Sequence, residues 1–274
     1  STTEGKGLSY AIVGCIREDK KGNLWVATEG GGLNFIDRKT GKTRWYTTKS
    51  CGLSSNNIQS LYYEEDKDAI WVGTHLGGLN RLDIKSGRAK TYRFRKGHPN
   101  TLTHNIIKDI LPYKDSLILA THYGIYMFDK VTGQRRDIFK GSDLEKIVKV
   151  VSKIFMDSKG NIWLTISNQG ILCHNLQSGK TTLFKPSGEG TISDSNIYDI
   201  IEDDYGKIWL ATANYGIDMF DPETEKFHNF DSQSYGLQSN RVYAFAKSAA
   251  SRNILFTTSA GFCSFDPDTK SFNN

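Results

Sequence analysis

The residues best suited to bind a ligand follow six similar apolar segments of the chain, together with one basic residue in a linker. They are amides, imidazoles, tyrosines, a carboxylate and a guanidinium, which offer directional hydrogen bonds and flat ring faces. Such groups converging on a concave surface suit a sugar-like ligand. The candidate ligand-binding residues are Glu29, His75, His122, Tyr123, Asn168, Gln169, Asn214, Tyr215 and Arg241.

The six apolar segments recur with a period of about 46 residues. The second residue of each segment steps along the chain by 46, 47, 45, 46 and 46 positions. A period this regular across the whole chain indicates a repeat architecture. The segments are 24–28, 70–74, 117–121, 162–166, 208–212 and 254–258.

Each repeat combines four short apolar segments with turns rich in Asp and Gly. Period-2 alternation with β-branched and aromatic residues is typical of strands. In turns such as 19–23 and 157–161, Asp accepts hydrogen bonds from the nearby backbone and Gly supplies positive φ. Only residues 143–151 resemble a turn of helix.

One four-stranded sheet cannot bury both of its faces alone, so the repeats must pack against one another. Repeats of this length stacked around an axis form a β-propeller; a β-solenoid is the alternative, but its repeats are shorter. We therefore predict an all-β fold, a β-propeller of four-stranded antiparallel blades with six repeats visible. Whether six blades close the ring or belong to a seven-bladed parent stays open. We assign residues 1–274 to one domain, with blades at about 8–50, 51–96, 97–140, 141–187, 188–233 and 234–274.

The antiparallel topology predicts where the candidate residues lie. In a four-strand meander, the linker between blades and the turn from the second to the third strand lie at the same end. The candidates therefore share one face of the disc, and the charged turns lie on the other. Loops on a rigid scaffold commonly carry binding residues.

Three of these residues allow a second interpretation. Glu29, His75 and His122 occupy one position on successive blades and could form an acid–base or metal-binding set. Equivalent turns on adjacent blades are more than one strand spacing apart, so one metal ion would need unusual reach. We predict no metal site, no catalytic residue and no cofactor. Linker Asn residues could serve only in Asx-turns, and the Trp residues suit the core.

Composition narrows the class of function further. The net charge of +5 is spread over the turns, which argues against nucleic-acid binding by this domain. The four cysteines show no C-x-x-C spacing, so zinc is not expected. No apolar run is long enough for a spanning helix, and the first residues lack a signal core. The chain is cytosolic, has lost a signal segment or is a piece of a longer protein.

Two further motifs carry a family resemblance. The linker Gly52-Leu53-Ser54-Ser55-Asn56-Asn57-Ile58 recurs in related forms, and Gly-Asn-Leu-Trp-Val-Ala-Thr occupies residues 22–28. Together with Gly-Gly-Leu-Asn at 31–34, these closely resemble the two-component regulator propeller repeat. That family forms the periplasmic sensor region of hybrid two-component systems in Bacteroides-type bacteria. Blades three and six depart from it, with Ile118 and Leu255 in the Trp position.

The resemblance implies a non-enzymatic, ligand-sensing periplasmic domain whose usual signal is an oligosaccharide. In such regulators the propellers precede a membrane helix, a histidine kinase and a response regulator, so phosphorelay and transcription regulation belong to the parent protein. The implied partners are a small carbohydrate, adjoining domains of the same polypeptide and a homodimer. Membrane contact would come only through other parts of the parent. The alternatives are a propeller enzyme, either a lyase or a hydrolase, and a protein-interaction scaffold.

Overall fold

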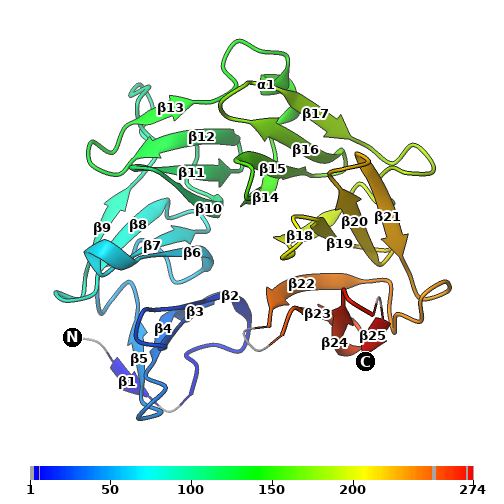
Figure 1. Cartoon of the computed structure of the whole chain (residues 1–274). Coiled ribbons are helices and arrows are strands. Elements are labelled where there is room, and N and C mark those ends of the chain that lie inside the picture. Colours follow the sequence, from blue (N-terminus) through cyan, green and yellow to red (C-terminus); the bar gives the residue numbers. More distant parts are fainter. Residues whose placement is uncertain (1–2, 6, 249–250, 270, 274) are drawn as a thin grey trace. The chain divides into compact units, whose positions relative to one another are not determined.

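The structure, a computed structural model, describes residues 3–5, 7–248, 251–269 and 271–273. The chain divides into two compact units, unit 1 (Ser1–Val151) and unit 2 (Ser152–Asn274). Six antiparallel sheets account for almost all regular structure (Figure 1). The predicted all-β fold with six four-stranded blades is confirmed, whereas the assignment of one domain stays a prediction.

Unit 1 contains three blades, each a meander in which consecutive strands pair. The first strands of neighbouring blades lie side by side, β2 next to β6 and β6 next to β10. The strands are β2 (Val13–Glu18), β3 (Leu24–Thr28), β4 (Gly32–Ile36), β5 (Thr43–Tyr46), β6 (Ile58–Glu64), β7 (Ala69–Thr74), β8 (Leu79–Asp83), β9 (Arg88–Tyr92), β10 (Ile107–Tyr113), β11 (Ser116–Thr121), β12 (Gly124–Asp129) and β13 (Arg135–Asp137).

Three short elements complete unit 1. Strand β1 (Thr3–Gly5) pairs with β5 as a fifth, outer strand of the first sheet. The blade predicted to start at residue 8 therefore extends further, because three residues are too few for an alternation pattern to show. A 3₁₀ turn, η1 (Glu65–Lys67), joins β6 to β7. The single helical turn α1 (Leu144–Ile147) confirms the expectation for 143–151.

Unit 2 repeats the same meander three times. Its strands are β14 (Val151–Met156, of which Val151 belongs to unit 1), β15 (Asn161–Ile166), β16 (Gly170–Asn175), β17 (Thr181–Phe184), β18 (Ile197–Glu202), β19 (Ile208–Thr212), β20 (Ile217–Asp221), β21 (Lys226–Phe230), β22 (Val242–Lys247), β23 (Ile254–Thr258), β24 (Gly261–Asp266) and β25 (Ser271–Asn273). Here β18 and β22 are first strands that lie side by side.

Tryptophan on the second strand anchors four of the blades. Trp25, Trp71, Trp163 and Trp209 are at most 2% exposed, which confirms the core interpretation. Each indole N–H donates to a carboxylate in the preceding hairpin. The distances are 3.4 Å to Asp19, 3.0 Å to Glu64, 2.9 Å to Asp157 and 2.8 Å to Asp203. A large apolar ring is thereby buried without an unpaired polar atom.

The acidic residue that receives the indole bond also shapes the hairpin. Asp203 Oδ1 accepts the backbone N–H of Tyr205 and of Lys207, both at 2.9 Å. Gly206 in the same turn has φ of 76°, a left-handed conformation that glycine adopts without strain. One carboxylate thus links turn formation to burial of the Trp.

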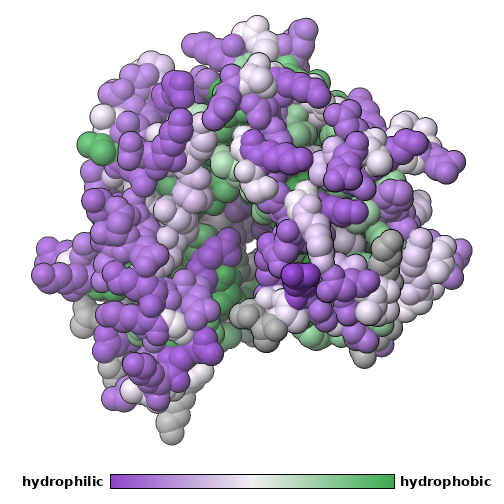
Figure 2. Space-filling view, viewed as in Figure 1, coloured by the Kyte–Doolittle hydropathy of each residue, from purple (hydrophilic) through white to green (hydrophobic). Residues whose placement is uncertain are grey.

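The surface of each unit is mainly hydrophilic, in contrast to the apolar core around the Trp residues. In the view of Figure 2, hydrophilic side chains cover most of each unit. Within the part of the chain that the structure describes, no helix has the length and apolar character needed to cross a bilayer.

Candidate functional site

Linkers and second-to-third-strand turns lie at the same end of each blade, which we call the linker end. After the second strand, the backbone N–H of His75 donates to Asn57 O at 2.9 Å. At the start of the third strand, Gly78 N–H donates to Asn105 O of the following linker at 2.8 Å. Unit 2 repeats the second contact between Gly216 and Asn240, also at 2.8 Å. The prediction that linkers and these turns share one end is therefore confirmed for these blades, whereas the placement of all nine candidates on one face stays a prediction.

The linker asparagines have a structural role. Asn56 Oδ1 accepts the backbone N–H of Thr48 at 2.8 Å. Asn105 accepts that of Phe94 at 2.8 Å, and Asn240 that of Ser232 at 2.7 Å. These side chains satisfy the backbone where it leaves the fourth strand, 8 or 11 residues before each Asn, so their role is structural but they do not form the expected Asx-turns.

In unit 1 the structure brings aromatic and imidazole rings together at the linker end of blade three. The ring centroids of His122 and Tyr123 are 5.3 Å apart. The ring of His104 lies 5.4 Å from His122 and 5.1 Å from Tyr123. Tyr123 is 62% exposed, while His104 is half-buried. His104 is not one of the nine candidate residues, although its position in the linker beside Asn105 indicates that it lies at the linker end.

The environment of His104 favours the neutral imidazole. Partial burial lowers its pKa, and the neighbouring His122 and His75 lower it further, because each would repel a second positive charge. Glu29, the remaining candidate of unit 1, is exposed. Among the described residues, no group of three or more His, Cys, Asp or Glu is arranged to hold a metal ion.

The candidates of unit 2 fall into two groups. Asn168 has a φ of 59°, a turn conformation that Asn tolerates well. Asn214 is held by Asp194, which accepts its backbone N–H at 3.0 Å and its side-chain amide at 3.1 Å. These two residues contribute mainly to turn structure. Gln169, Tyr215 and Arg241 are exposed at the same linker ends.

Tyr215 and Arg241 belong to chain segments that contact each other. Tyr215 is 54% exposed, and its backbone N–H donates to Thr212 Oγ1 at 3.0 Å, which fixes the turn and leaves the ring at the surface. Arg241 donates from Nε to Ala213 O at 3.3 Å. That contact places the guanidinium beside the turn that carries Tyr215.

A buried carboxylate lies beneath this linker end. Asp218 is fully buried and accepts the backbone N–H of Ser193 at 2.8 Å and Asn229 Nδ2 at 2.9 Å. Burial raises its pKa to about 6, although the hydrogen bonds from Ser193 and Asn229 oppose the rise. Asn34 and Asn80 hold the linkers of unit 1 from the equivalent position. Asp218 is therefore a structural group that titrates near neutral pH.

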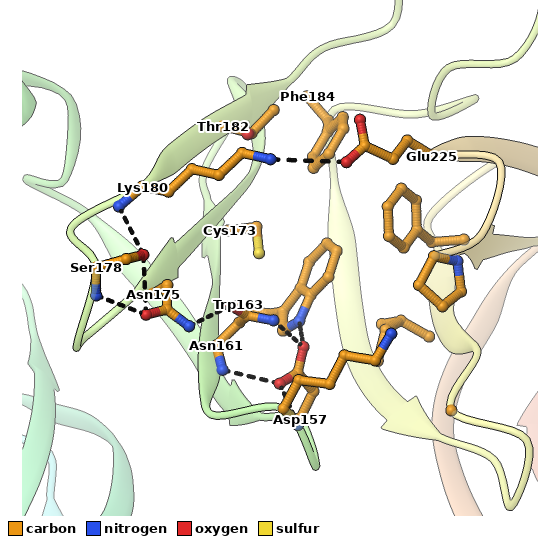
Figure 3. Close-up of a pocket in the computed structure, with 15 residues that line it drawn as sticks. Asp157, Asn161, Trp163, Cys173, Asn175, Ser178, Lys180, Thr182, Phe184 and Glu225 are labelled. Atoms are coloured by element: carbon orange, nitrogen blue, oxygen red, sulfur yellow. Dashed lines mark hydrogen bonds and ion pairs between the residues drawn. The ribbon is translucent and has the colours of Figure 1, made fainter.

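The opposite end of unit 2 contains a groove that sequence reasoning missed (Figure 3). It has a volume of about 300 Å³ and lies between the blades of β14–β17 and β18–β21. Trp163 and Cys173 form part of its lining, and Lys180 reaches across it to Glu225 at 3.6 Å (Figure 3). Burial raises the pKa of Cys173 to about 12, so this thiol is a poor nucleophile.

The neighbouring blade of unit 2 has a second groove at the corresponding position. It has a volume of about 800 Å³ and is lined by Trp209, Met219 and Asp221, among others. Because Met219 occupies the position of Cys173 in the register with the Trp strand, the two grooves follow from the repeat. Their recurrence indicates a feature of blade packing, so the linker end remains the candidate site.

Comparison with known proteins supports the resemblance inferred from the sequence. Residues 7–30 and 191–214 match the model of the two component regulator propeller family. Among curated proteins, none matches the chain.

Solved structures show the same fold over nearly the whole chain. The extracellular domain of BT3049 from B. thetaiotaomicron, described as a hybrid two component system, superposes with a TM-score of 0.79 at 22% identity, over 98% of this chain and 35% of that one. The extracellular domain of BT4673 from the same organism, described as a one component system, gives 0.73 at 21% identity, with coverages of 96% and 35%. The chain therefore spans about a third of the length of these two structures.

An enzyme shares the architecture as well. Virginiamycin B lyase from Staphylococcus aureus has a TM-score of 0.70 at 15% identity, over 100% of this chain and 87% of the lyase. At such identities the likenesses show the fold alone, which is a β-propeller with six four-stranded blades in this chain.

Proposed function

We propose that this chain is a non-catalytic, extracytoplasmic sensor propeller that binds an oligosaccharide at its linker ends, a proposal supported by the match of residues 7–30 and 191–214 to the two component regulator propeller model. It would form part of a hybrid two-component signalling protein located in the periplasm. Binding would shift the population of arrangements between the propeller and the adjoining domains, and so bias a signal.

One observation carries the choice of ligand. The exposed groups at the linker end of unit 2 combine an aromatic ring, an amide and a guanidinium, namely Tyr215, Gln169 and Arg241. A saccharide presents hydroxyl groups and an apolar ring face, which match hydrogen-bonding groups and an aromatic face respectively. The single groups contribute little individually, so affinity requires several of them to act together.

The test is isothermal titration calorimetry of the full chain with neutral and uronate-containing oligosaccharides. We expect binding by one class, and we expect a Tyr215→Ala/Arg241→Ala variant to weaken it at least about 10-fold, as for truncated anchor residues. The chain offers a matched control at the hairpin end, because Tyr205 and Arg252 are the same residue types and are also exposed. Tyr205→Ala/Arg252→Ala should leave affinity unchanged.

Two outcomes would contradict the proposal. Equal losses in both double variants would remove the linker end as the site. Absence of heat with every saccharide, confirmed with the complete extracytoplasmic region of the parent protein, would remove the ligand class. Turnover of any saccharide by the native chain would favour the alternative of a propeller enzyme.

A further inference from the structure

Two exposed tyrosines form a stacked pair in unit 2. Tyr198 lies on β18 and Tyr243 on β22, with ring centroids 6.1 Å apart and ring planes inclined by 13°. Each residue is 45% exposed. A contiguous exposed pair of aromatic rings is more informative than scattered apolar residues, because isolated exposed rings are common on protein surfaces.

Both tyrosines lie at a β-bulge in the first strand of their blade. The register of β18 with β19 shifts between Ile197 and Asp199, and that of β22 with β23 shifts between Val242 and Ala244. Tyr198 and Tyr243 are therefore the extra residues of two β-bulges. A bulge bends the strand and redirects the side chain that it carries.

The propeller repeat itself does not require tyrosine at this position. Unit 1 has the same register shift in the first strand of each blade, and the extra residues there are Gly14, Gln59 and Lys108. The β-bulge is thus common to these blades of both units, whereas the aromatic pair is found on two adjacent blades of unit 2. This contrast suggests a role other than folding.

The strands that carry the pair are joined by a hydrogen bond, and the carboxylate that accepts it is neutralised by a lysine. Asp199 accepts the backbone N–H of Phe245 on β22 at 2.9 Å. The same carboxylate pairs with Lys153 of β14 at 3.0 Å. The rings therefore stand on a cross-linked base whose charge is compensated, which favours an uncharged portion of a ligand above them.

The pair adjoins the linker-end groups described above. Asn196, two residues before Tyr198, accepts the N–H of Ala213 at 3.0 Å. Arg241, two residues before Tyr243, donates to Ala213 O. The turn that presents Tyr215 is therefore bonded to both chain segments that carry the stacked rings.

We propose that the Tyr198–Tyr243 pair is the stacking platform for a pyranose ring of the bound saccharide, an inference that rests on the proposed function. Tyrosine rings supply a large, rigid contact area at a small cost in side-chain entropy. With nearly parallel planes and centroids 6.1 Å apart, the rings leave no space for a third ring between them, so the sugar packs on their outward side. Its hydroxyl groups then lie within the region of Tyr215 and Arg241.

The experiment uses the full chain and the saccharide class that binds it in calorimetry. Tyr198→Ala/Tyr243→Ala should lower affinity at least about 10-fold, the usual effect of removing aromatic anchors. Tyr198→Phe/Tyr243→Phe should stay within about threefold of the native chain, because the ring faces remain. Gln59→Ala, at the equivalent bulge of unit 1, is the matched control and should bind as the native chain does.

A second measurement locates the ligand independently of affinity. In a chain labelled with ¹³C on the tyrosine rings, saccharide should shift two signals, which are assigned as those missing from Tyr198→Phe and Tyr243→Phe. Unchanged affinity in the double Ala variant, with no shift of these two signals, overturns the platform alone. If the native chain binds no saccharide, the proposed function fails and the platform fails with it.

Discussion

Units 1 and 2 share one backbone plan but differ at equivalent positions of the repeat. In unit 1, Arg81 pairs with Trp71 across β7 and β8, and Glu64 accepts Arg81 Nε at 3.3 Å. Lys130, from the next blade, reaches the same carboxylate at 2.7 Å. In unit 2, Cys173 occupies the position of Arg81, and a groove is present there.

The aromatic packing between blades is common to both units, whereas the residues beside the Trp ring vary. The rings of Trp71 and Phe128 are 5.9 Å apart, and those of Trp163 and Phe220 are 5.3 Å apart, both edge-to-face. The stack between blades therefore persists when the neighbouring residue changes from Arg to Cys. Variation at such positions alters the surface of a blade without altering its core.

The largest effect is expected from breaking the ion cluster of unit 1. Glu64→Ala would leave Lys130, Arg81 and the indole N–H of Trp71 without their shared acceptor. The carboxylate is buried and both cations are half-buried, so the loss should approach the cost of about 3–5 kcal/mol for removing one partner of a buried pair. Urea denaturation would measure this loss. An effect below that of Asp157→Ala, the equivalent change in unit 2, would contradict the prediction.

Asp157→Ala should have the intermediate effect. It removes the acceptor of Trp163 Nε1 and of the backbone N–H groups of Lys159 and Asn161. No buried cation is left unpaired, so the expected loss is about 1–3 kcal/mol, the cost of an unsatisfied buried donor. The same urea titration measures it, with Asp204→Ala, an exposed residue of a neighbouring hairpin, as the control. A loss equal to that of the control would rule out the structural role of the carboxylate.

The comparison between Asp218 and its equivalents Asn34 and Asn80 predicts a pH effect. Because the folded-state pKa of Asp218 is raised to about 6, this group contributes stability that is complete below its unfolded pKa and is lost as pH rises through about 6. When the pH is lowered from 7 to 5, the unfolding free energy of the native chain should therefore rise by about 1–2 kcal/mol relative to that of Asp218→Asn. This rise is smaller than the full difference between the folded and unfolded pKa implies, because the range covers only part of the titration. Parallel unfolding free-energy curves for the two chains would disprove the raised pKa.

The smallest effect concerns the ring cluster of unit 1. In NMR titration, the pKa of His104 should lie below the usual value for histidine, about 6.5. His122→Ala should raise the pKa of His104, because it removes a neighbouring positive charge as well as part of the burial. Stability from this group should fall as pH drops from the unfolded pKa, about 6.5, toward the lowered folded value. A pKa of His104 at or above about 6.5 would contradict the packing of the three rings.

Several features were predictable because they depend on local sequence. The Asp of the first hairpin, the Gly of positive φ and the buried Trp are separated by fixed spacings, as in Asp203, Gly206 and Trp209. The linker end was also predictable, because an antiparallel meander returns alternate turns to the same side. Assigning roles to individual polar residues was less reliable, since Asn214 proved to be held by Asp194, 20 residues away.

The four-stranded repeat, the number of repeats and the end at which the linkers gather can be predicted from the sequence alone, because strand periodicity and turn chemistry act over a few residues. The folded structure was needed to show that Tyr198 and Tyr243 stack, that His104 joins His122 and Tyr123, and that Lys130 reaches Glu64. Two of these three contacts join different blades, and all three depend on how the fold brings together side chains that are distant in the sequence. The residue pattern within one repeat does not specify such contacts.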